Sequence, residues 1–140
     1  MNKVDIEVMV YRGSLGEDHK LRRHAALLII QPGSRTGDLV HVSGAPCSFQ
    51  AVCYQGYKPF SSDTLVGRKH ICQVSKSQEE VRNICLYTPV NNREDGWNYQ
   101  NFVGDMLNRL VDHGVITEAE KDLVIDFMTD AILQGVDQDR

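Results

Sequence analysis

The sequence predicts an α+β domain in which an antiparallel sheet of about four to five strands packs against helices that come late in the chain. Short apolar or alternating segments separated by turn residues fill the first two-thirds of the 140 residues. Helix-start signals and apolar residues at helical spacing occupy the last third. The order of strands before helices argues against a doubly wound fold. No repeat or linker divides the chain, so we treat residues 1–140 as a single domain.

Five segments have the pattern of strands. Residues 4–12 alternate apolar and polar side chains, as a half-buried strand does, whereas 24–31 is apolar on both faces, as a central strand is. The turn signals of "PGSRTGD" join that strand to residues 39–44, which predicts an antiparallel hairpin. Residues 49–57 and 70–75 complete the predicted sheet, with "SLGEDHKLRR" and "KPFSSDTLVGR" as loops.

Two helices are predicted from their capping residues. Ser77 followed by Glu80 fits a capping box and predicts a short helix over residues 77–86. Asp95 is the predicted N-cap of a second helix, which ends near Gly114. The apolar residues of "YQNFVGDMLNRL" recur at helical spacing, so this second helix should turn one face inward.

A third helix is predicted near the C-terminus. It begins at Thr117, which forms a capping box with Glu120, and it ends at Gly135. The residues expected to face inward are Leu123, Phe127, Met128, Ala131 and Ile132. Residues 136–140 are predicted to be a frayed tail.

Composition and charge narrow the class of function. The formal net charge is −4 and there is no basic block, so we expect no nucleic-acid partner. No apolar run has the length needed to cross a bilayer, and "MNKVDIEVMVYRG" lacks the apolar core of a signal peptide. We therefore expect no membrane partner and a cytoplasmic location. Cys47, Cys53, Cys72 and Cys85 form no C-x-x-C pair and are most simply explained as buried apolar residues.

Two histidines stand out in the predicted hairpin. His24 begins one strand, and His41 lies inside the next. Adjacent antiparallel strands bring side chains on the same face within reach of each other. If the register pairs these two, one imidazole can act as acid or base while the other orients it. The alternative is two half-buried histidines whose ring nitrogens are satisfied by backbone carbonyls.

Tyr99 is the third candidate for the site, because it stands at the start of the second predicted helix. A helix N-terminus presents free N–H groups and positive potential, which favour a phenolate, a thiolate or an oxyanion. Asn98 and Gln100, on either side of the tyrosine, are candidates for polar contacts with a substrate. Trp97 is a candidate for lining a pocket, although a core position explains it more simply.

The run "RHAALLI…GDLVHVSGAPCSFQ…WNYQNFVGDMLNRLVDHGVI" resembles small, mostly fungal proteins with the pattern R-H-W-[AS]-L, L-x-H-V-x-G-[SA]-P and N-C-Q-x-[WF]-V. The likeness covers residues 20–116 in short motifs. Those proteins in turn resemble circularly permuted papain-like folds of the NlpC and lecithin:retinol acyltransferase kind. The resemblance implies that His24 is the histidine of such a site, that His41 orients it, and that Tyr99 stands where the nucleophilic Cys would be.

The absence of that Cys shapes the first functional hypothesis. Tyrosine, with an ordinary pKa near 10, is a poor acyl acceptor. We therefore expect a non-covalent acid–base enzyme of the isomerase, cyclase or lyase type, acting on a small organic molecule in natural-product biosynthesis. In this hypothesis Tyr99 donates to a developing oxyanion, His24 moves the proton and His41 holds its tautomer. No metal and no cofactor is implied.

Two alternatives stay open from the sequence. The chain can be a catalytically inactive papain-like module that binds a ligand or a protein partner, with Tyr99 merely filling the space of the nucleophile. It can also be a cysteine hydrolase or acyltransferase with a relocated thiol, for which Cys47 in "GAPCSF" is the candidate. The sequence carries no signal for the identity of the substrate or for the oligomeric state.

Overall fold

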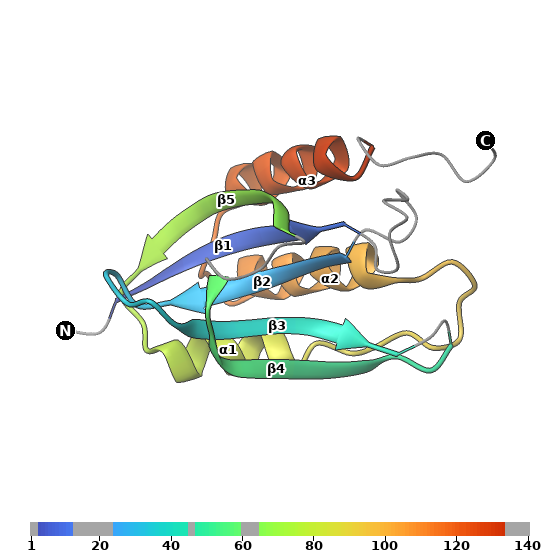
Figure 1. The fold of residues 1–140 in the computed structure, drawn as a ribbon, viewed down its shortest axis with the longest axis horizontal. Coiled ribbons are helices and arrows are strands. Elements are labelled where there is room, and N and C mark those ends of the chain that lie inside the picture. Colours follow the sequence, from blue (N-terminus) through green and yellow to red (C-terminus); the bar gives the residue numbers. More distant parts are fainter. Residues whose placement is uncertain (1–2, 13–23, 45–46, 60–64, 134–140) are drawn as a thin grey trace.

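The computed structural model of the chain describes residues 3–12, 24–44, 47–59 and 65–133. Within them the chain forms strands first and helices last, which confirms the predicted α+β class (Figure 1). The strands are β1 (Val4–Tyr11), β2 (His24–Ile30), β3 (Gly37–Ser43), β4 (Gln50–Tyr57) and β5 (Leu65–Val74). The helices are α1 (Gln78–Leu86), α2 (Tyr99–Asp112) and α3 (Glu118–Leu133).

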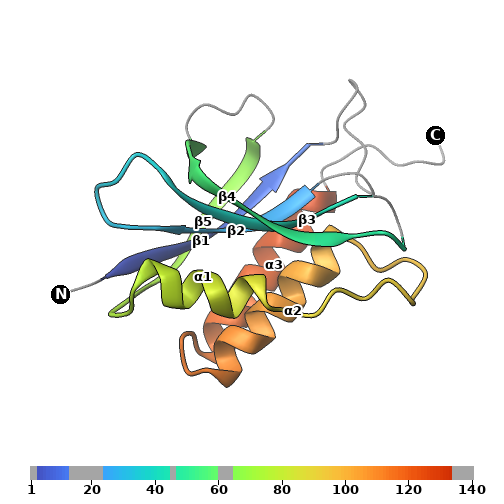
Figure 2. The same ribbon diagram turned by 90° about the horizontal axis from the view of Figure 1, so that it is seen from below.

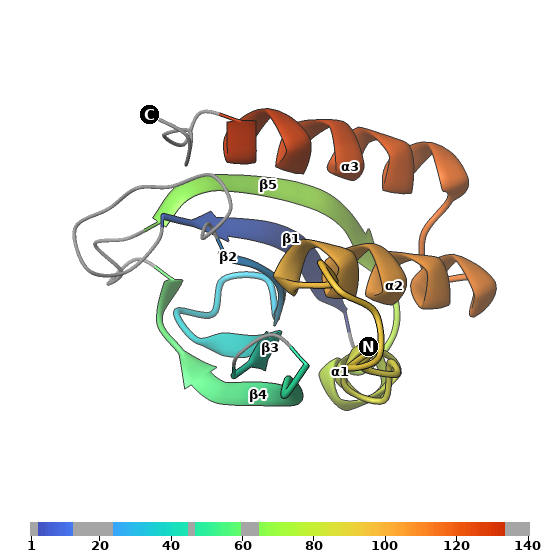
Figure 3. The ribbon, with the colours of Figure 1, turned by 90° about the vertical axis from the view of Figure 1, so that its right-hand side faces the viewer.

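The five strands form one antiparallel sheet in the order β4-β3-β2-β1-β5. The predicted hairpin of β2 and β3 is confirmed, with Leu28 across from Leu39. β2 is the central strand, which agrees with its apolar side chains on both faces. Figure 3 shows the strands following one another from β5 to β4 around a curved sheet. This order leaves β4 and β5 as the edge strands.

All three helices lie on one face of the sheet (Figure 2). α2 packs against β2 and β3, α3 against β5 and β1, and α1 against β3. The sheet contributes alternate side chains to this core, among them Val4, Ile6, Val8, Val10, Ala25, Leu27 and Ile29. On the predicted inward face of α2, Val103, Met106 and Leu110 are fully buried as expected and Tyr99 is partly buried, while Phe102 and Leu107 are buried as well.

The opposite face of the sheet, called the far face below, carries a second apolar cluster. Its buried members are Met9, Ala26, Leu28, Ile30 and Leu39. The end of β4 and the start of β5 rise from the sheet on this side (Figure 2), and the Tyr11 and Tyr57 hydroxyls are hydrogen-bonded over it at 2.6 Å. β1 is therefore buried on both faces, and the prediction of a half-buried strand is wrong.

The caps of α1 and α3 agree with prediction, but the cap of α2 does not. The hydroxyl of Ser77 accepts from the Glu80 N–H, which confirms the predicted N-cap of α1. The predicted N-cap of α2, Asp95, is wrong. Asn98 is the N-cap, because its side chain accepts from the Gln100 N–H and its own N–H donates to the Asn101 side chain. At the start of α3 the Thr117 and Glu120 capping box forms as predicted.

Two further boundaries differ from the sequence prediction. β5 begins at Leu65, so residues 65–68 are strand where a loop was predicted, because they pair with the second half of β1. Leu123 was expected to face inward, but its side chain is 61% exposed, whereas Met128, Ala131 and Ile132 are buried as predicted. The predicted loop over 14–23, the helix end at Gly135 and the frayed tail at 136–140 lie outside the described residues.

Candidate functional site

The rings of His24 and Tyr99 stack on each other, with centroids 4.0 Å apart and an interplanar angle of 18°. His24 is the first residue of β2 and Tyr99 the first residue of α2, so the contact lies where a strand and a helix both begin (Figure 1). Phe49 packs against Tyr99 in an edge-to-face arrangement, with the ring centroids 5.3 Å apart. The structure thus brings together two of the three predicted catalytic residues, face to face rather than through a hydrogen bond.

The Tyr99 hydroxyl is directed at the segment that follows β3. It donates to the Gly44 carbonyl oxygen over 3.4 Å, which is long for an O–H···O bond. Gly44 has a φ of +119°, and a Cβ at this position would lie 2.6 Å from the Ser48 carbonyl oxygen. Only glycine fits this turn without strain. Because its bond to the Gly44 carbonyl is long, the Tyr99 hydroxyl is held weakly and remains available to another acceptor.

His41 lies on β3, and only one of its two ring nitrogens is hydrogen-bonded to a described residue. Nδ1 is 3.0 Å from the Val42 carbonyl oxygen. Because a carbonyl only accepts, Nδ1 must carry the proton, and the neutral ring then has its lone pair on Nε2. That Nε2 is buried and has no hydrogen-bond partner among the described residues. Buried polar atoms in proteins nearly always have a partner, so this nitrogen needs an explanation.

The two histidines affect each other electrostatically. Burial lowers the pKa of His24, and the charge of a protonated His41 lowers it further. Burial also lowers the pKa of His41, against the opposing effect of its bond to the Val42 carbonyl. Leu27 is across from Val40 in the hairpin, and His24 and His41 lie just beyond this pair on the two strands. At neutral pH both imidazoles are therefore neutral and close to each other.

The three predicted substrate-binding residues have structural contacts of their own. Trp97 is only 6% exposed, and its indole N–H donates to the Asp105 carboxylate at 3.3 Å. The Asn98 side chain is engaged as the N-cap of α2. Gln100 is half-buried next to Tyr99 on the first turn of α2. Helix capping explains the position of the Asn98 side chain, and packing explains that of Trp97. A substrate contact by either residue stays a prediction that no contact in the structure supports.

The strands and the helix that carry the candidate site lie in a region that matches a protein-family model. Residues 8–117 match the family of unknown function DUF6540. The chain belongs to this family. Neither a search of curated proteins nor a search of solved structures returns a match to it.

The DUF6540 match includes every member of the candidate site, His24, His41, Tyr99 and the turn at Gly44. It ends at Thr117, so that α3 begins directly after it.

The DUF6540 region also contains all four cysteines, which are free thiols. Burial raises the pKa of Cys72 and of Cys85 to about 12, and burial also raises the pKa of Cys53. Because the thiolate is the nucleophilic form, these three are poor nucleophiles. Cys47 is exposed, contrary to the expectation of a buried residue, and its Sγ lies 4.0 Å from a carboxylate oxygen of Asp95.

Sequence reasoning did not place Tyr54 and Phe49, the aromatic neighbours of the site, next to His41 and Tyr99. Tyr54 stacks on His41 with centroids 5.2 Å apart, although 58% of its surface is exposed. Phe49, which contacts Tyr99, is fixed by its backbone: its N–H donates to the Asn92 side-chain oxygen at 2.8 Å, and its carbonyl accepts from the same amide at 3.1 Å. Only an exact strand register, which a single sequence does not give, could have placed Tyr54 beside the histidine.

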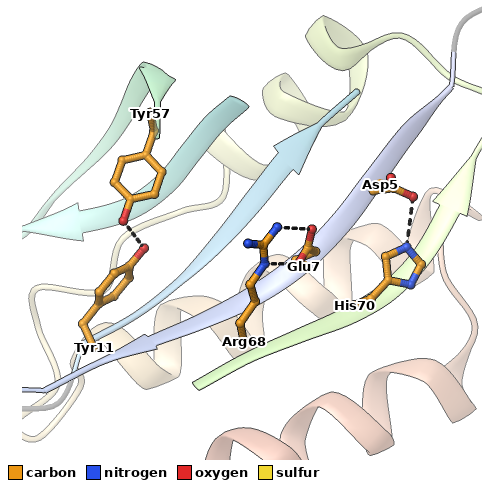
Figure 4. A network of polar contacts seen from close by, with 6 residues as sticks. All are labelled: Asp5, Glu7, Tyr11, Tyr57, Arg68 and His70. Atoms are coloured by element: carbon orange, nitrogen blue, oxygen red, sulfur yellow. Dashed lines mark hydrogen bonds and ion pairs between the residues drawn. The ribbon is translucent and has the colours of Figure 1, made fainter. Parts of the chain in front are cut away.

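A second group of polar side chains, also missed, joins β1 to the two edge strands, and its member Tyr11 is paired with His24 on β2. Arg68 forms a two-pronged ion pair with Glu7, whose side chain is mostly buried. In the part of the chain that the structure describes, no group of three or more His, Cys, Asp or Glu side chains is placed to hold a metal ion. Figure 4 shows the pairs Tyr11–Tyr57, Glu7–Arg68 and Asp5–His70.

None of the described helices, α1, α2 and α3, is both long enough and apolar enough to cross a bilayer.

Proposed function

We propose that the chain is an enzyme that moves protons on a small organic molecule without forming a covalent intermediate, as isomerases, cyclases and lyases do. The observation that carries the proposal is the buried Nε2 of His41, which has no partner among the described residues. A neutral imidazole with a free lone pair in a partly desolvated site is suited to act as a general base. A ligand that donates a proton to Nε2 would also supply the missing hydrogen bond.

The roles of the other two side chains follow from their contacts. Since the charge of a protonated His41 lowers the pKa of His24, protonation of one imidazole opposes protonation of the other. This favours His41 as the base and His24 as its neighbour in a relay, the reverse of the division expected from the resemblance. The Tyr99 hydroxyl, with its long bond to Gly44, would donate to an oxygen on which negative charge develops.

The arrangement supports a permuted papain-like scaffold as part of this proposal. In the resemblance, a helix N-terminus faces a histidine on one strand and a polar residue on the next strand. Here Tyr99 begins α2, His24 begins the neighbouring β2, and His41 lies on β3. Natural-product biosynthesis, a cytoplasmic location and chemistry without a cofactor also belong to the proposal, since they come from the resemblance and the composition.

A second candidate function is an inactive papain-like module that binds a ligand or a partner. The observation that favours it is the stacking of Tyr99 on His24, because the phenol then fills the space next to the imidazole and its hydroxyl points to a backbone carbonyl. In that case the histidines could be replaced without loss of function, provided that the fold is kept.

Deletion and complementation of the gene separates the two candidates. The small molecules of the deletion strain would be compared with those of strains that carry the wild type, His41→Gln, His24→Gln or Tyr99→Phe. Loss of a general acid or base costs about 10²- to 10⁴-fold in rate, so we expect the missing compound to return with the wild type but not with His41→Gln. Tyr87→Phe, at an exposed tyrosine at the end of α1, is the control and should restore the compound. Full restoration by His41→Gln would contradict the enzyme and favour the inactive module.

A further inference from the structure

The surroundings of His41 show which kind of group can reach its free nitrogen. Within the sheet His41 is paired with Val52 on β4. The side chain of Val52 is apolar and cannot donate to Nε2. The donor has to come from another direction.

The exposed side of this position is formed by Tyr54. It is paired with Leu39 on the far face of the sheet, and β4 is an edge strand. Its ring stacks on His41 at an interplanar angle of 26°, but more than half of its surface is exposed. The ring thus covers an imidazole with one face and offers much of its remaining surface to solvent.

Four rings form two stacked pairs, and each ring comes from a different element. Tyr54 and His41 stack between β4 and β3, and His24 and Tyr99 stack between β2 and α2. The two pairs are linked, because the charge of a protonated His41 acts on His24. Flat aromatic surfaces favour flat aromatic ligands, in offset or edge-to-face contact. An aliphatic ligand would gain less from these surfaces.

We propose, on the basis of the proton-transfer function above, that the ligand is a planar aromatic compound with a hydroxyl or N–H group. Its ring packs against Tyr54, and its O–H or N–H donates to Nε2 of His41. Phenols and N–H heteroaromatic compounds have this chemistry. Tyr54 is then a residue that determines specificity, and it takes no part in the proton transfer.

Three small probes separate the features of this ligand. Phenol has both the aromatic ring and the O–H donor. Anisole keeps the aromatic ring without the donor, and cyclohexanol keeps the donor on a ring that is not aromatic. Each would be titrated into the ¹⁵N-labelled full-length chain while the imidazole nitrogens and the backbone amides are observed by NMR. Phenol should shift the Nε2 resonance of His41 and bind more tightly than the other two probes.

Variants of Tyr54 test the stacking directly. An aromatic contact contributes about two- to tenfold to affinity, so Tyr54→Leu should weaken phenol binding by that factor while Tyr54→Phe should retain it. Tyr87→Leu, at an exposed tyrosine on another element, should leave the affinity unchanged. Because Tyr54 is largely exposed, its variants should keep the fold, which the amide spectra check.

Each other outcome counts against the proposal. If phenol causes no shift at Nε2 of His41 up to its solubility limit, the proposed site is wrong. If anisole shifts Nε2 as phenol does, no donor is recognised. If cyclohexanol binds as tightly as phenol, the aromatic class is wrong while His41 keeps its place as the base. Failure of the catalytic proposal is seen separately, as restoration of the metabolite by His41→Gln.

Discussion

The imidazole of His24 lies flat against the phenol of Tyr99, with the ring centroids 4.0 Å apart. This contact joins the first residue of the central strand to the first residue of the helix that packs on it. It fixes the N-terminus of α2 next to the histidine pair.

Replacement of Tyr99 should separate the ring from the hydroxyl. Tyr99→Phe keeps the stack and loses only a long bond to the Gly44 carbonyl, so the free energy of unfolding should fall by less than about 1 kcal/mol. Tyr99→Leu loses the aromatic contacts with His24 and Phe49, and we expect a loss of about 2 kcal/mol. Urea unfolding measures both. Equal losses in the two variants would mean that the stack does not stabilise the fold.

The turn at Gly44 should tolerate no side chain. An alanine there would have a positive φ and a Cβ 2.6 Å from the Ser48 carbonyl oxygen, so Gly44→Ala should cost about 2 kcal/mol or more. The matched control is Gly104→Ala in α2, where a Cβ meets nothing within 4 Å. There alanine should stabilise the protein by roughly 0.5–1 kcal/mol. The two variants would be compared by thermal and urea unfolding, and a stable Gly44→Ala protein would contradict the geometry of this turn.

The histidine pair should make stability depend on pH. The folded protein holds His24 and His41 at pKa values below the ordinary 6.5, so the unfolded chain binds more protons as the medium becomes acidic. The stability that comes from their neutral forms is complete above pH 6.5 and is lost as the pH falls toward the folded pKa values. Urea unfolding at about pH 7.5 and about pH 5.5 measures the loss. The double variant His24→Gln/His41→Gln should lose less, and an unchanged loss would rule out these two groups as its source.

Removal of only one partner of the Glu7–Arg68 ion pair on the far face should lower the free energy of unfolding. Arg68→Met leaves the carboxylate of Glu7 mostly buried without its two-pronged partner, and we expect a loss of about 2–3 kcal/mol, since Arg68 itself is partly exposed. The double variant Glu7→Leu/Arg68→Met should lose less, because no buried charge remains. For comparison, Lys76→Ala in an exposed pair with Glu80 should cost below about 0.5 kcal/mol. A double-mutant cycle by urea unfolding checks the order.

The parts of the fold that local patterns determine were predictable. The hairpin of β2 and β3 follows from two apolar runs and the turn residues between them, and the capping box at Thr117 follows from its spacing to Glu120. The N-cap of α2 was not predictable in the same way. Asp95 and Asn98 are both good caps, and the side chain of Asn101 completes the box with Asn98.

Long-range strand pairing explains why the start of β5 was not predicted. Residues 65–69 form a strand because β1 is there to pair with them, and a Cβ at Gly67 would lie 3.1 Å from the Phe127 ring. A glycine in this stretch had reduced the strand signal.

The site shows the same division between local pattern and tertiary contact. Motif positions indicated that His24, His41 and Tyr99 belong together, but ring orientations depend on tertiary packing. The hydrogen bond of His41 to the Val42 carbonyl and the stack with Tyr54 follow from side-chain rotamers and the β3–β4 register, which shifts between Gly37 and Leu39. No single-sequence pattern contains that shift.

His41 has a neutral Nε2 that finds no partner within the described part of the chain, and we propose this nitrogen as the base. The most direct test is an imidazole ¹⁵N NMR titration of the full-length protein, with His41→Gln used to assign the resonances. The account predicts that at neutral pH the proton of His41 resides on Nδ1, that Nε2 has the shift of an unprotonated nitrogen, and that the ring titrates below 6.5 together with His24. A proton on Nε2, or a ring that is charged at neutral pH, would contradict it.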